Sequence, residues 1–99
     1  MAGPFDKWTK LRNEAKQLRL ACIRTELETC RTFATLAVTE CQIGDGEAAE
    51  HCAIESEKAY NIVTRFLSGV TCNEERQRLE MNLRELRETL NDLHQRIGK

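Results

Sequence analysis

The chain has 99 residues, enough for one folded domain, residues 1–99, with a modest hydrophobic core. Its residues are 40% hydrophobic and 31% charged, a composition that suits a folded chain and excludes an intrinsically disordered one. The net charge of −1 argues against a dedicated nucleic-acid-binding protein, and the sequence has no apolar run of the about 18 residues that a membrane span needs.

The first predicted helix is long because nothing interrupts it. Neither glycine nor proline occurs between Phe5 and Ile43, so we expect one helix over about residues 5–43. Gly44 suits the left-handed end of that helix, and Asp45 suits the N-cap of the next one.

Two more helices follow. The second is expected over about residues 46–68, before Gly69. Thr71 and Glu74 then have the spacing of a capping box, which predicts a third helix over about residues 72–97. Three helices joined by two short turns predict an all-α, up-down-up three-helix bundle.

Each predicted helix carries an apolar seam with a period of 3.5 residues, which is typical of coiled coils and of helices packed side by side. The seam residues are Ile23, Leu27, Cys30, Ala34, Ala37 and Cys41 in the first helix; Ala49, Cys52, Ser56, Ala59, Val63, Phe66 and Val70 around the second; and Leu79, Leu83, Leu86, Leu90, Leu93 and Ile97 in the third. Small residues on the first two helices allow their backbones to approach closely near the turn.

The first helix is longer than its neighbours. At a rise of 1.5 Å per residue it measures about 58 Å, and the other two measure about 35–40 Å. In an antiparallel hairpin that turns at Asp45, Ser68 comes level with Cys22. Residues before about Leu20 are therefore expected to overhang the bundle.

The overhanging segment has its own apolar stripe and a basic border. The stripe is Trp8, Leu11, Ala15, Leu18 and Cys22, with Phe5 nearby; the basic residues are Lys7, Lys10, Arg12, Lys16 and Arg19. On an ideal helix the stripe is rotated by about 110° from the seam of the same helix, so one partner surface does not easily cover both. Residues 5–24 hold six basic and two acidic residues, whereas residues 25–99 hold nine basic and fourteen acidic ones.

These features predict a docking helix that binds an acidic surface. Its expected anchors are Phe5, Trp8, Leu11 and Leu18, and its orientation would be set by Lys7, Lys10, Arg12 and Arg19. Two alternatives remain open. The first helix could break near Leu20 and fold back as a fourth short helix, or the segment could bind an anionic membrane surface as a basic amphipathic helix.

The threonines of the first helix lie mostly opposite its seam. They are Thr25, Thr29, Thr32, Thr35 and Thr39. Because β-branched residues are mediocre helix formers, this face is either plain solvated surface or a face that something covers.

The five cysteines do not have the spacing of a metal-binding or redox motif. We expect each of them to serve as a small buried hydrophobic residue. In an oxidising compartment Cys41 could form a disulfide with Cys52, and Cys22 with Cys72; Cys30 would then have no disulfide partner.

Both histidines are expected at the end of the bundle that contains the first turn. There, His51, His94, Cys41 and Cys52 could hold a transition metal, although solvated or hydrogen-bonded histidines are the simpler expectation. No metal ion or other cofactor is therefore expected.

The stretch "RETLNDLH", from Arg87 to His94, resembles the RNase motif of HEPN-type helical proteins. In that family an arginine and a histidine act on the RNA backbone, usually across a dimer. The resemblance covers eight residues and implies, as an alternative function, a dimeric RNA-cleaving protein that uses Arg87 and His94.

The favoured expectation is a non-enzymatic protein that acts by helix-to-helix association, either as a homodimer or as an adaptor for an acidic protein. No small-molecule substrate is expected. The start "MAGPFDKW" lacks the apolar core of a signal peptide, so we expect a cytoplasmic protein with reduced cysteines.

Overall fold

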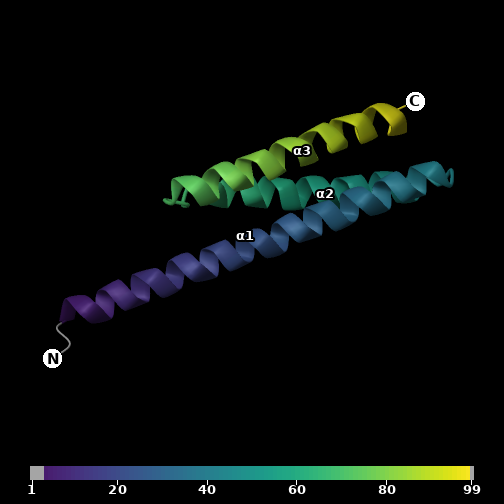
Figure 1. Ribbon diagram of the computed structural model, residues 1–99. Helices are drawn as coiled ribbons and strands as arrows, with labels where there is room; N and C mark the ends of the chain where they lie inside the picture. The colour runs from purple at the N-terminus through teal and green to yellow at the C-terminus, as the bar shows by residue number, and fades with distance from the viewer. Residues whose placement is uncertain (1–3, 99) are drawn as a thin grey trace.

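The computed structural model describes residues 4–98 and consists of three helices: α1 (Pro4–Gln42), α2 (Gly46–Leu67) and α3 (Asn73–Ile97). α1 and α2 form an antiparallel hairpin, and α3 runs back along α2 (Figure 1). The N-terminal part of α1 projects past the other two helices, and the molecule is 65 Å long. The predicted up-down-up three-helix bundle with an overhanging first helix is confirmed.

The turn between α1 and α2 forms as the sequence predicts. Gly44 has a φ of 86°, a conformation that costs glycine little and other residues more. The side chain of Asp45 accepts a hydrogen bond from the backbone N–H of Ala48 at 3.0 Å, and so caps α2. Together these two residues end one helix and begin the next within three residues.

The start of α3 differs from the prediction. The N-cap residue is Cys72, and its side chain makes no capping hydrogen bond. Thr71 lies one residue before the N-cap, so the predicted capping box of Thr71 and Glu74 is wrong. A hydroxyl at that position is one residue out of register with the amides that a cap must reach.

The core lies along the seams of α1 and α3 as predicted. Ile23, Cys30 and Ala37 are buried on α1, and Leu90 and Leu93 are buried on α3. Burial of their apolar side chains is the main favourable contribution to folding.

The seam of α2 is broader than predicted, since this helix packs against both others. Its buried residues are Ala49, Ala53, Ser56, Ala59 and Val63. Ala53 was missed, and Phe66 was placed in the seam but is 43% exposed. Leu67 packs against the core in its place, and Val70 closes the core after the helix ends.

Small residues let α1 and α2 approach closely at the middle of the hairpin. The hydroxyl of Ser56 donates to the backbone carbonyl of Cys30 at 2.7 Å, and its oxygen lies 3.3 Å from Cys30 Sγ. Both side chains are buried. A larger residue at either position would push the helices apart.

α1 is continuous through Leu20, so the alternative in which the first segment folds back as a fourth helix is wrong. Within residues 4–98, no helix has both the length and the apolar composition needed to cross a membrane.

Candidate functional site

The overhanging part of α1 makes no buried contact with the other residues that the structure describes. All residues from 6 to 19 are exposed, and we call this segment the arm. Trp8 is 70% exposed, Leu11 50% and Leu18 68%. The helix turns every 3.6 residues, so these three side chains lie along one side of the arm. The arm therefore presents a contiguous apolar stripe to water.

Phe5 was predicted as a fourth anchor. Its backbone belongs to α1, but its side chain lies outside the described residues, so that role stays a prediction.

Three of the predicted basic residues surround the stripe without an acidic partner. Lys7, Lys10 and Arg12 are exposed, and none of them forms an ion pair with another residue in the described part of the chain. Their charges are available to an external acidic surface.

Arg19 has a partner inside its own chain. Its Nη1 donates to the carbonyl oxygen of Gly69 at 2.9 Å, which ties the base of the arm to the turn between α2 and α3. A Cβ at position 69 would clash with this nitrogen, so a side chain there would require the guanidinium to move. Of the four basic residues predicted to orient a partner, Arg19 thus also has a structural contact that the sequence did not indicate.

Two further exposed apolar residues lie in line with the apolar stripe beyond the arm, with threonines at most of the positions between. Leu36 is 43% exposed and Ile43, just after the helix, is 70% exposed. Both fall on the same alternating steps of three and four residues that lead from Trp8 to Cys22. We call the full set the outer stripe: Trp8, Leu11, Ala15, Leu18, Cys22, Thr25, Thr29, Thr32, Leu36, Thr39 and Ile43. Sequence reasoning stopped this stripe at Cys22, although the repeat itself was readable further on.

Three of the four threonines of the outer stripe satisfy their hydroxyl groups within the helix. Thr25, Thr29 and Thr39 donate to the carbonyl oxygens of Ala21, Thr25 and Thr35, at 3.0, 3.0 and 3.1 Å. The methyl groups of these threonines are therefore the part of the side chain that can contact another molecule. The face can therefore be covered without leaving these donors unpaired.

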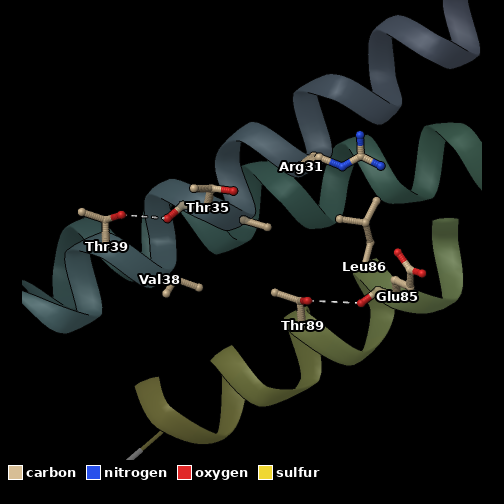
Figure 2. Close-up of a pocket in the computed structure, with 8 residues that line it drawn as sticks. Arg31, Thr35, Val38, Thr39, Glu85, Leu86 and Thr89 are labelled. Atoms are coloured by element: carbon tan, nitrogen blue, oxygen red, sulfur yellow. Dashed lines mark hydrogen bonds between the residues drawn. The ribbon is translucent and has the colours of Figure 1, made fainter.

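A groove separates the second half of α1 from α3 (Figure 2). It has a volume of about 330 Å³ and is lined by Arg31, Ala34, Thr35, Val38, Thr39, Glu85, Leu86 and Thr89. Thr39 and Thr89 donate their hydroxyl protons to the carbonyls of Thr35 and Glu85, one turn earlier in each helix. The hydroxyl protons of Thr39 and Thr89 are therefore engaged by the backbone of their own helices.

Arg87 and His94, the two residues of the RNase-like motif, both contact Glu57 of α2. Arg87 donates from Nη1 to Glu57 Oε2 at 3.0 Å and from Nη2 to Oε1, and His94 Nε2 lies 3.1 Å from Oε1. The Arg87 guanidinium also lies 5.0 Å from the centre of the Tyr60 ring, a cation–π contact. This cluster joins α2 to α3 and gives both residues a structural contact.

The cluster changes the ionisation of its members. The hydrogen bond from Arg87 holds the pKa of Glu57 below its ordinary value, and the contact with His94 adds to this effect. The same hydrogen bond raises the pKa of Arg87. Glu57 therefore stays ionised to lower pH in the folded chain than in the unfolded one.

The cysteines and histidines do not assemble a metal site in the described part of the chain. No three His, Cys, Asp or Glu side chains within residues 4–98 come close enough to hold an ion. His51 is exposed, and Cys41 and Cys52 are half-buried. All five cysteines are free thiols, and only Cys30 is fully buried, which raises the pKa of its thiol. The expectation that every cysteine is buried is wrong for Cys22 and Cys72, which are exposed.

Comparison with known proteins gives no relative from which a function could be transferred. No family model, no curated protein and no solved structure matches this chain.

Proposed function

We propose that this chain is a non-enzymatic helical protein that acts by protein–protein association, with the arm as its docking helix. The observation that carries the proposal is the exposure of Trp8, Leu11 and Leu18 on one side of a helix that its own bundle leaves uncovered. Burial of each large side chain stabilises a complex by about 1.5–3 kcal/mol. A contiguous apolar patch on a charged surface is typical of an interaction site.

The charges favour an acidic docking surface. Lys7, Lys10 and Arg12 flank the stripe, and residues 25–99 hold fourteen acidic and nine basic residues. Residues 25–99 of a second copy of the chain are therefore an acidic partner for the basic arm. Opposite charges at the rim of an interface accelerate encounter and fix orientation, and added salt weakens them.

The cytoplasm is the proposed location. All five cysteines are free thiols, and a reducing compartment keeps thiols in that state.

Sedimentation velocity on the intact chain tests the proposal. The variant with Trp8→Ala and Leu11→Ala removes the two outermost described anchors, and alanine preserves the helix because it is the best helix former. The matched control is Met81→Ala, which removes an apolar side chain on α3 that is 63% exposed. Circular dichroism checks that all three proteins are equally helical.

The expected result is an assembly that the arm variant loses and the Met81→Ala variant keeps. If the parent protein sediments as a monomer at every concentration, self-association through the arm is wrong. If the arm variant assembles as well as the parent, the docking role of the arm is wrong.

A further inference from the structure

We infer that the partner is a second copy of this chain, bound antiparallel along the outer stripe of α1. In this arrangement the arm of each copy lies on the second half of α1 of the other copy. The inference rests on the proposed function of the arm and adds its docking surface, which centres on Leu36 and Ile43.

The first argument is the length and period of the outer stripe. It runs from Trp8 to Ile43, which are 35 residues apart, or five heptads. Pairing of helices as a coiled coil needs a repeat of about three to four heptads, and in this repeat apolar residues lie toward both ends while threonines fill most of the middle. The heptad repeat also drifts by about 20° per heptad on a straight helix, and a left-handed supercoil follows this drift.

The second argument is that the bundle leaves this face open. The buried residues of α1 in the bundle are Ile23, Leu27, Cys30, Ala34 and Ala37. The outer stripe lies on another side of the helix, and within its second half Leu36, Thr39 and Ile43 are exposed. A second helix can therefore lie along the stripe without displacing α2 or α3.

The third argument is charge, and it decides the direction. Residues 6–24 of α1 hold six basic and two acidic residues, whereas residues 25–42 hold one basic and three acidic ones. Parallel pairing would place the two basic arms side by side. Antiparallel pairing places each basic arm against an acidic half, so the charges attract.

The positions of the large apolar residues select the register. With Leu18 of one copy opposite Leu36 of the other, Leu11 falls opposite Ile43, and both pairs occur twice by symmetry. Trp8 then reaches past the end of the partner's α1, to the level of Gly46. This register also brings Arg12 beside Glu40 of the second copy at the flanking positions that specify pairing in coiled coils. Neither Arg12 nor Glu40 forms an ion pair with another described residue of its own chain.

The centre of the proposed interface is formed by Cys22 and the threonines of the outer stripe. The hydroxyl groups of Thr25 and Thr29 already donate to the carbonyls one turn earlier, so their burial leaves no unpaired donor. In this arrangement the threonine face of α1 forms the middle of the interface between the two copies.

Charge reversal in the full-length protein tests the inference through the dimer dissociation constant. Arg12→Glu alone and Glu40→Arg alone should each weaken the dimer about ten-fold, since the symmetric interface contains the pair twice. The double variant should recover most of the parent affinity. In a parallel dimer the two positions would lie about 42 Å apart, and Arg12→Glu would instead relieve repulsion between the arms.

A second variant distinguishes two outcomes: that the antiparallel arrangement is wrong, and that the arm has no docking role at all. Leu36→Ala with Ile43→Ala should weaken the dimer as strongly as an arm variant with Leu11→Ala and Leu18→Ala, which removes the residues opposite them. If only the arm variant weakens it and the charge pair shows no recovery, the arm docks elsewhere and the antiparallel arrangement is overturned. If the arm variant has no effect, or the parent protein is a monomer, the inference fails together with self-association through the arm.

Discussion

Arg87 of α3 holds Glu57 of α2 through both terminal nitrogens of its guanidinium, one of them 3.0 Å from the carboxylate. The contact crosses the interface between the second and third helices, where His94 joins it. A bidentate pair fixes the relative rotation of two helices, because both hydrogen bonds must be satisfied at once. It therefore contributes to the placement of α3 against α2.

Loss of this pair should lower the stability of the bundle. Arg87→Met keeps much of the side-chain volume and should reduce the free energy of unfolding by about 1 kcal/mol, measured by urea denaturation. The matched control is Arg76→Met, which breaks an exposed pair with Glu80 inside α3. Equal effects of the two substitutions would contradict a special role for the pair between helices.

The same pair predicts a pH dependence. The pKa of Glu57 is lowered below its ordinary value of 4.5 in the folded chain, so the unfolded chain binds the proton more readily. The stabilisation is therefore present in full above the unfolded value and is lost as the pH falls through the folded value. Thermal unfolding of the parent and of Glu57→Gln should differ most above pH 4.5 and converge in more acidic solution. A difference that stays constant across this range would exclude Glu57 as the titrating group.

Packing in the core should dominate over surface contacts. Leu90 is fully buried on α3, and Leu90→Ala should reduce the free energy of unfolding by about 2–5 kcal/mol because it leaves a cavity. Met81→Ala removes an exposed side chain from the same helix and should change it by less than about 0.5 kcal/mol. Urea denaturation with both variants checks the contrast, and similar midpoints would mean that α3 is not packed as described.

The thiols should react in the order of their exposure. Cys22 and Cys72 are exposed, whereas Cys30 is buried and burial raises the pKa of its thiol. Because the thiolate is the reactive form, alkylation of the native protein in dilute solution, where the proposed dimer dissociates, should label the two exposed residues first and Cys30 only on unfolding. Peptide mass spectrometry after a short labelling pulse measures this order, and early labelling of Cys30 would place it outside the core.

The first turn offers a pair of matched glycine substitutions. Gly44 has a φ of 86°, so Gly44→Ala should cost about 1–2 kcal/mol in the free energy of unfolding. Gly46 begins α2 with open space around its Cα, so Gly46→Ala should be neutral or slightly stabilising. Thermal denaturation distinguishes them, and equal tolerance at both positions would contradict the left-handed turn.

Much of the fold could be predicted from local pattern. Helix periodicity and the Gly44–Asp45 pair define where α1 ends and α2 begins, because these signals act within a few residues. The length difference between α1 and α2 then predicts the arm by geometry alone. The exposure of Trp8, Leu11 and Leu18 follows from this difference in helix length, because no part of α2 reaches that end of α1.

The rest depended on contacts between distant parts of the chain. Phe66 satisfies the period of the α2 seam, yet Leu67 packs against the core in its place at the end of the hairpin. Arg19 contacts Gly69 across 50 residues, and Glu57 binds Arg87 across 30. Charged residues carry no periodic signal for such pairing, so the sequence identified Arg87 and His94 by a motif and not by their partner.

Amide hydrogen exchange of residues 6–19, followed over a wide range of protein concentration, tests the docking role of the arm most directly. An uncovered end of a helix exchanges rapidly, because no tertiary packing supports its hydrogen bonds. We predict rapid exchange in dilute solution and increasing protection of these amides as the concentration rises. Exchange that stays rapid at every concentration would contradict the account.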